Sequence, residues 1–439
     1  MRLDDLNKSN ITKFEIFPNS GGEAISFLNG VIELLYYENI MSETVRVTAT
    51  IIDTGNSADA DDGTGAKVTA SEKLKITGTE KVYLEFEDAL NQKVSFITDA
   101  DALRIAGRDR ITHVKKDIET LELVSKEYLF NESVRVVEKY DGKISDSVNK
   151  ILTGILKTEK KLDIESTFNE KPFIGTMKKP FWFTMWLASQ SIPEKPGAAG
   201  ITGGFVLYET HNGFKFKSID GLLSGTGPTN QNSGGFKSYI FNNTDSTVLP
   251  PGYTGKILNY DFTDSADVKD QIMMGAYHTS VNLFNSYESS FNCNPLDIKA
   301  QEDVASHPGT EYGQNLDKIF IDNPSRFFTG NESIGGLKPI DQSKELDVVK
   351  KDYLSAATSR YNQLYTVKIA ITIAGDFSLE AGQLIFCDFQ EMSTKTNPTN
   401  NPRMSGVYLI AELCHRIDPH YQSFTSLKLI RDSYGRKAK

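Results

Sequence analysis

Residues 365–373 read YTVKIAITI, and this stretch decides the fold class of the chain. Its odd-numbered positions hold Tyr, Val or Ile and its even-numbered positions hold Thr, Lys or Ala, which is the period-2 pattern of a half-buried β-strand. A helix is predicted before this strand, from about residue 343 to 361. Three more candidate strands follow, at residues 383–389, 407–415 and 423–431. Residues 343–439 are therefore interpreted as a helix followed by an antiparallel β-barrel.

The beginning of the chain, residues 1–130, shows the same alternation. Residues 45–51 (VRVTATI) and 82–87 (VYLEFE) place apolar side chains at every second position. Between them lies the acidic loop 53–67, which begins DTGNSADADDGTG and is too polar for a core. This spacing of strands and turns is typical of an antiparallel barrel or sandwich, so a first β-barrel is predicted here.

The middle of the chain is predicted to hold α+β insert domains. In residues 131–225, apolar residues over 144–156 recur at the spacing of one helix face, and Pro180 suits the first turn of a second helix. A β-hairpin follows, with its turn at residues 211–213. Residues 226–342 mix short apolar runs with polar stretches and are interpreted as a mixed insert domain. The whole pattern predicts a β-rich α+β fold with two antiparallel β-barrel domains and α+β insert domains between them.

Composition limits the classes of function. The chain has 439 residues, enough for roughly two to four domains, and a formal net charge of −10. DNA binding needs clustered Lys and Arg, so it is not expected, whereas an acidic surface suits DNA that slides past without adhering. Three widely spaced cysteines fit reduced thiols in a cytoplasm. The sequence has no apolar signal region and no run approaching about 18 apolar residues, so no membrane insertion is expected.

No group of residues predicts a metal site. Asp59, Asp61 and Gly63 have the spacing that opens a calcium loop, but its twelfth position is Ala70 instead of a bidentate Glu. The histidines do not predict a metal site either. His415 and His420 lie close in sequence without a third ligand at a metal-like spacing.

Catalytic and cofactor-binding residues are likewise not predicted. No GxSxG, HExxH, P-loop or helix-opening GxGxxG motif occurs, and His211 is interpreted as an ordinary polar residue of a hairpin turn. One alternative stays open: glycoside hydrolysis needs only two carboxylates, and 58 acidic residues allow a hydrolase of cell-wall or capsule polysaccharide. A receptor-binding module is the third hypothesis, and the chain lacks the repeats of a fibre.

Four segments have a distinctive order and spacing: residues 128–156 (with YDGKIS), 179–188 (beginning KPF), 204–220 (with NGFKF) and 359–376 (SRYNQL to GD). Together they resemble the central baseplate hub protein of T-even-type contractile-tailed bacteriophages. The C-terminal part, from Gly375 to Asp432, also resembles the closing barrel of phage late-control tail proteins and of the base of type VI secretion spikes. Gly375 and Gly382 allow the tight turns between its strands.

The resemblance implies an architecture and a role. In that family each subunit carries two similar tube-type barrels, and a homotrimer forms a ring of six. The ring matches a sixfold tail tube protein on one side and a threefold central spike protein on the other, among other baseplate (wedge) proteins. DNA passes through its channel without specific binding. The chain is thus expected to be a non-enzymatic virion protein of the tail baseplate, assembled in the host cytoplasm, with loops 53–67 and 395–403 departing from the family pattern.

Overall fold

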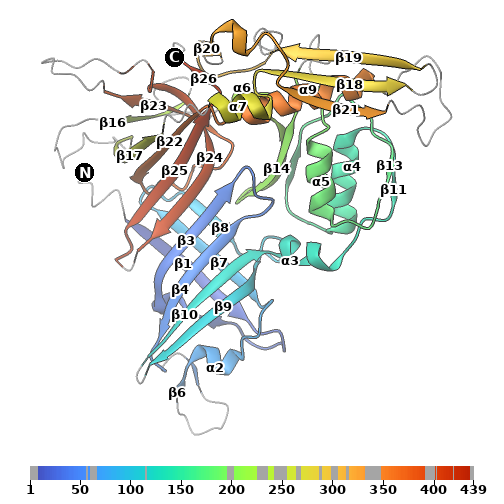
Figure 1. The fold of residues 1–439 in the computed structure, drawn as a ribbon. Coiled ribbons are helices and arrows are strands. Elements are labelled where there is room, and N and C mark those ends of the chain that lie inside the picture. Colours follow the sequence, from blue (N-terminus) through green and yellow to red (C-terminus); the bar gives the residue numbers. More distant parts are fainter. Residues whose placement is uncertain are drawn as a thin grey trace, which may run out of the picture.

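Antiparallel strands dominate the structure (Figure 1). The computed structural model describes residues 8–435 except 56–57, 60–66, 114–115, 195–201, 225–235, 242–254, 264–267, 286–288, 298–304, 313–315, 332–347, 391–400, 402 and 419. One large sheet is accompanied by smaller sheets and by helices, so the predicted β-rich α+β fold is confirmed.

The N-terminal strands form from the alternating sequences. They are β1 (Ser9–Phe17), β2 (Ile25–Ser26), β3 (Val31–Asn39), β4 (Arg46–Asp53), β5 (Ala58–Asp59), β6 (Lys67–Val68), β7 (Lys81–Asp88), β8 (Lys93–Phe96), β9 (Leu103–His113) and β10 (Lys116–Ser125), with the 3-10 helix Leu28–Gly30 and α2 (Ala70–Leu74). In β4, Val47, Ala49 and Ile51 are buried while Arg46 is exposed, because successive side chains point to opposite faces of a sheet. We refer to β1–β10 as the N-terminal strand unit.

The four strands predicted near the C-terminus are confirmed as β22–β25, and other strands accompany them. They are β22 (Val367–Ala374), β23 (Leu384–Phe389), β24 (Gly406–Ile417), β25 (Ser423–Arg431) and the short β26 (Ser433–Tyr434). The region interpreted as a mixed insert supplies β16 (Lys237–Phe241), which pairs with β23, and β17 (Ile257–Thr263), which pairs with β22. We refer to β16, β17 and β22–β25 as the C-terminal strand unit.

The two strand units are joined through β24. Its first residues, Gly406–Leu409, pair with β23, and its last, Glu412–Ile417, pair with β3. A single sheet of 14 strands therefore runs from one unit into the other, and a single hydrophobic core cluster contains residues of both. The two predicted β-barrel domains correspond to the two strand units. Within the described residues the edges of the shared sheet meet only at single bridges, Ile240 with Lys256 and Lys8 with Gln422.

Helices and a hairpin lie beside β3 (Figure 1). The elements are α3 (Lys126–Ser133), β11 (Lys139–Tyr140), α4 (Ile144–Lys150), the π-helical turn Ile151–Ile155, β12 (Leu162–Ile164), β13 (Phe173–Ile174), α5 (Pro180–Ala188), β14 (Phe205–Thr210), β15 (Gly213–Ser218) and α6 (Ile219–Ser224). Both predicted helices and the predicted hairpin are confirmed. Gly213 has a φ of 111°, and a Cβ there would stand 2.2 Å from the Lys161 carbonyl oxygen, so the turn requires glycine.

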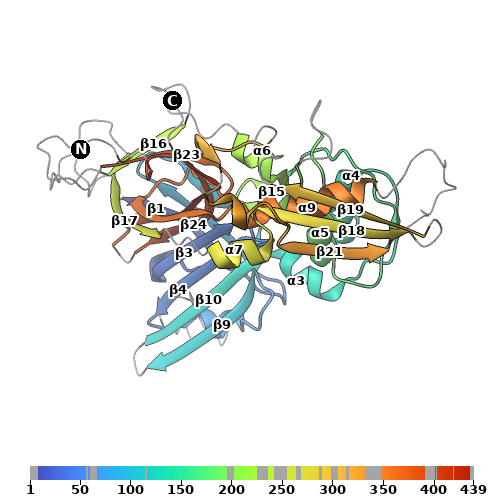
Figure 2. The same ribbon diagram turned by 45° about the horizontal axis from the view of Figure 1, so that its top comes forward.

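A small three-stranded sheet and a long helix form the remaining layer. Figure 2 shows β18 (His278–Asn285) between β19 (Ser290–Asp297) and β21 (Arg326–Asn331), close to α9 (Val348–Gln363). The shorter elements are α7 (Val268–Met274), β20 (Glu311–Tyr312) and the 3-10 helix Lys318–Phe320. The predicted helix at 343–361 thus corresponds to α9, and residues 343–347 lie outside the described residues.

The division of the chain into four segments stays a prediction. Strands β16 and β17 come from the mixed insert but pair with C-terminal strands, so they link these two segments. Loop 53–67 is described in part only, and so is loop 395–403. Every helix of the described residues is too short or too polar to cross a lipid bilayer.

Candidate functional site: a buried charged joint

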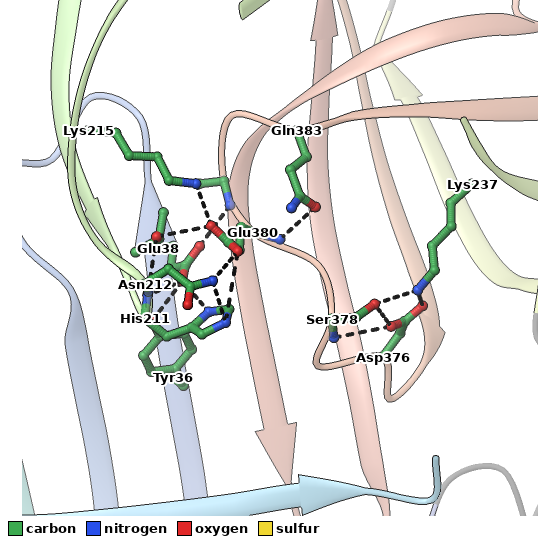
Figure 3. A network of polar contacts seen from close by, with 12 residues as sticks. Tyr36, Glu38, His211, Asn212, Lys215, Lys237, Asp376, Ser378, Glu380 and Gln383 are labelled. Atoms are coloured by element: carbon green, nitrogen blue, oxygen red, sulfur yellow. Dashed lines mark hydrogen bonds and ion pairs between the residues drawn. The ribbon is translucent and has the colours of Figure 1, made fainter. Parts of the chain in front are cut away.

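Three segments that are far apart in the sequence meet where the two strand units join (Figure 3). They are the end of β3, the hairpin of β14 and β15, and the loop between β22 and β23. Their charged and polar side chains lie against one another with little exposure. We call Tyr36, Glu38, His211, Lys215 and Glu380 the joint.

Glu38 is the centre of the joint. Its Oε1 accepts hydrogen bonds from the Tyr36 hydroxyl at 2.7 Å and from the His211 backbone N–H at 2.9 Å. Its Oε2 accepts one from the Ala381 N–H at 2.7 Å. The His211 ring Nδ1 lies 3.4 Å from Oε1. A single buried carboxylate therefore ties β3 to the hairpin and to the loop between β22 and β23.

Glu380 makes the second set of contacts. It accepts a hydrogen bond from the Thr210 hydroxyl at 3.1 Å and is bound by the Asn212 side-chain amide and the Lys215 ammonium. Burial raises the pKa of Glu380, but the charges of Lys215 and His211 and the hydrogen bonds outweigh burial, so its pKa is lowered. Glu380 is therefore ionised at neutral pH, and cations of the hairpin balance its charge.

Two histidines of the joint region prefer opposite protonation states. Burial lowers the pKa of His211, but the Glu38 hydrogen bond and the nearby carboxylates more than offset burial and raise it. His415 is fully buried, and burial together with the His211 charge lowers its pKa to about 3. The His415 ring stacks on Tyr36, with centroids 5.9 Å apart. The joint thus contains a histidine, His211, that favours the cation, and next to the joint lies His415, which stays neutral.

A second buried cluster fastens the hairpin to the N-terminal strand unit. Lys160 Nζ lies 2.5 Å from Glu209 Oε1 and 3.1 Å from Glu127 Oε2. Glu209 Oε2 also accepts hydrogen bonds from the Val45 N–H at 3.1 Å and the Ser125 hydroxyl at 2.5 Å. Because Glu209 is fully engaged by groups of the chain, its contribution is to position β14 against β4 and β10.

Further ion pairs fasten β16 and α9. Asp376 Oδ2 lies 2.5 Å from Lys237 Nζ and accepts a hydrogen bond from the Tyr239 hydroxyl at 2.8 Å, which holds β16 (Figure 3). On α9, the fully buried Arg360 donates to Asp432 at 2.7 Å and to Asp220 at 2.9 Å. These ion pairs therefore hold β16 within the C-terminal strand unit and tie α9 to the segments that carry Asp220 and Asp432.

A cleft of about 950 Å³ runs along the junction of the two units. Outward-facing side chains of both units line it, among them Arg46, Glu122, Asp261, Glu412 and Lys428. Since its walls belong to different units, the orientation that the joint enforces also sets the width of this cleft.

The residues considered from the sequence are not brought together into a chemical site. Asp59 lies on β5, Ala70 begins α2, and Asp61 and Gly63 lie outside the described residues. His415 is buried in β24, whereas His420 is exposed in the following turn. No group of three or more His, Cys, Asp or Glu within the described ranges is arranged to hold a metal ion.

The interpretation of His211 as an ordinary turn residue needs correction, since its side chain is only 12% exposed and contacts Glu38. A signal for the buried charges was present in the sequence. Glu38 has the parity of the inward-facing Leu34 and Tyr36, and Glu209 that of Phe205 and Leu207. A carboxylate on the apolar face of a strand predicts a buried, partnered group.

The sequence and the fold were compared with those of known proteins. No protein-family model matches the sequence, and no curated protein matches it either. Two solved structures share its fold over nearly the whole length of both chains. One is a tail protein from Neisseria meningitidis MC58, with a TM-score of 0.53 and 10% identity, covering 96% of each chain. The other is the 43 kDa tail protein of prophage MuSo2 from Shewanella oneidensis, with a TM-score of 0.53 and 8% identity, covering 96% of this chain and 98% of that one. The chain therefore has the fold of phage tail proteins, as the resemblance in its sequence predicted.

Proposed function

We propose that this chain is a structural, non-enzymatic subunit of a contractile phage tail, namely the central hub of its baseplate. Three copies form a ring that adapts the sixfold tail tube to the threefold spike, surrounded by other baseplate proteins in the virion. DNA passes through the ring without specific binding, in keeping with the net charge of −10.

The observation that carries the proposal is the pairing of β3 with β24. It fuses two strand units of one chain into a continuous sheet with a shared core, so that three chains supply six strand units. A ring of this kind can present six units to a tube and three subunits to a spike. The shared fold with tail proteins over nearly the full length supports the same role.

The buried joint supports a mechanical task. Glu38 and Glu380 are engaged by donors from three segments of the chain, which fixes the angle between the strand units. A buried ion pair is weak evidence for stability, whereas in some proteins it specifies one arrangement of the parts that it joins. A subunit that transmits movement of the spike to the tube needs such a fixed angle.

Solution mass tests the proposal. We would measure the purified chain by sedimentation velocity, alone and with its spike protein. A species of three times the chain mass of 48.8 kDa in either condition is expected, and imaging should then show a closed ring. A lasting monomer in both conditions would overturn the ring while leaving the fold unaffected.

A further inference from the structure

Both tryptophans of the chain lie on α5, and one of them is half exposed. Trp182 is 48% exposed, and its ring is nearly parallel to that of Trp186, with centroids 6.3 Å apart. The Trp186 ring in turn packs against the edge of the buried Phe173, at 5.6 Å. The exposed indole is therefore held by the core of this layer. A fixed, exposed Trp is a frequent energetic centre of protein interfaces.

The segment 174–178, which directly precedes α5, exposes more apolar surface. Met177 is 70% exposed and Ile174 is 53% exposed. The segment 174–178 lies close against the backbone at Val136, because the Met177 N–H donates to the Val136 carbonyl and a Cβ on Gly175 would stand 2.4 Å from that same oxygen. Its shape is thus preset, and an apolar surface that is preset and exposed favours association.

The surface is also basic. Residues 171–186 contain three lysines and no Asp or Glu, whereas the whole chain has a net charge of −10. One of the three, Lys179, is paired with Glu132 from outside this segment. Lys178 Nζ lies 5.6 Å above the Trp182 ring, and Lys171 Nζ lies 5.8 Å above the Trp186 ring. Within the described part of the chain, Lys178 forms no ion pair. We call Lys171, Met177, Lys178, Trp182 and Trp186 the Trp182 face.

Charge decides what the Trp182 face fits. A basic rim around aromatic side chains selects an acidic partner surface. The rest of this same chain carries an excess of acidic residues, since three lysines within a chain of net charge −10 leave the remainder even more negative. In a closed ring, each subunit contacts its two neighbours through two different surfaces, so a basic face on one copy can meet an acidic face on the next.

We infer that the Trp182 face is the surface through which one copy of this chain binds an acidic surface of the next copy. The inference rests on the proposed ring and deepens it, because it assigns one side of the contact between subunits.

Substitutions on the Trp182 face test the inference by sedimentation velocity, in whichever condition the unsubstituted chain forms its ring. Trp182→Ala should weaken assembly about tenfold or more, as loss of an interface centre does. Lys178→Glu should weaken assembly less, and more at low than at high salt, because salt screens the exposed charge. Phe291→Ala is the matched control, since Phe291 is 57% exposed on β19 and should leave assembly unchanged. Thermal unfolding of each variant confirms that it folds.

Tryptophan fluorescence gives an independent readout. Because Trp182 and Trp186 are the two tryptophans of the chain, emission excited selectively from tryptophan reports the Trp182 face alone. If the next copy covers this face, the emission shifts to shorter wavelength over the same concentration range in which the mass rises.

Each outcome is decisive. Rings that form equally well from Trp182→Ala and Lys178→Glu, or with unchanged emission, overturn the inference but leave the ring intact. Variants that form normal rings but no longer take up the spike also overturn it, since the face would then serve the spike. If the unsubstituted chain stays monomeric, the proposed ring itself fails, and the inference about the Trp182 face fails with it. The unsubstituted chain alone shows this, without any variant.

Discussion

At the scale of single residues, Glu38 binds three segments with a side chain that is almost fully buried. We predict that Glu38→Ala lowers the free energy of unfolding by about 3–5 kcal/mol, because it leaves the Tyr36 hydroxyl and two backbone N–H groups without their acceptor. Urea denaturation measures this loss.

Glu33→Ala on the same strand is the control. Glu33 pairs with Arg416 at 2.8 Å, with the two side chains 32% and 55% exposed, so its loss should cost less than about 1 kcal/mol. Equal losses for the two variants would contradict a special role of Glu38.

His211 makes the joint sensitive to pH. Its folded-state pKa is raised, so the stability it contributes is fully present below its ordinary pKa of about 6.5 and is lost as the pH rises through the folded-state value. We expect the difference in unfolding free energy between the unsubstituted chain and His211→Gln to shrink from pH 6 to pH 9. A pH-independent difference for His211→Gln would refute the assignment.

At the scale of elements, the hairpin depends on Gly213. Gly213→Ala should destabilise the protein by about 1–3 kcal/mol, because alanine is strained at a φ of 111° and its Cβ would collide with the Lys161 carbonyl. Gly154→Ala offers a matched control in the π-helical turn, where a Cβ meets nothing within 4 Å. That variant should be neutral or stabilising by up to about 1 kcal/mol. Thermal denaturation of both variants would show whether they differ in sign.

At the scale of the whole molecule, the shared sheet and core predict cooperative unfolding. Strands β4 and β25 belong to different units but to one sheet and one core cluster. We expect amide protons of both strands to lose protection from hydrogen exchange at the same denaturant concentration. Loss of protection in one strand well before the other would show that the units fold independently.

Much of the local structure was predictable from the sequence. The alternation at 365–373 specifies β22, Pro180 marks the start of α5, and Gly213 marks the hairpin turn, because side-chain period and backbone freedom act over a few neighbouring residues.

The pairing of distant segments was decided only by the tertiary structure. Alternation shows which side chains face the core but not which strand lies alongside, so β16 and β17 could not be assigned to the C-terminal strands. The same holds for β24, which serves two units because it is long enough to pair at both ends. Glu38 and Glu380 share a joint although the chain separates them by hundreds of residues, and only the folded sheet brings them to the same hairpin.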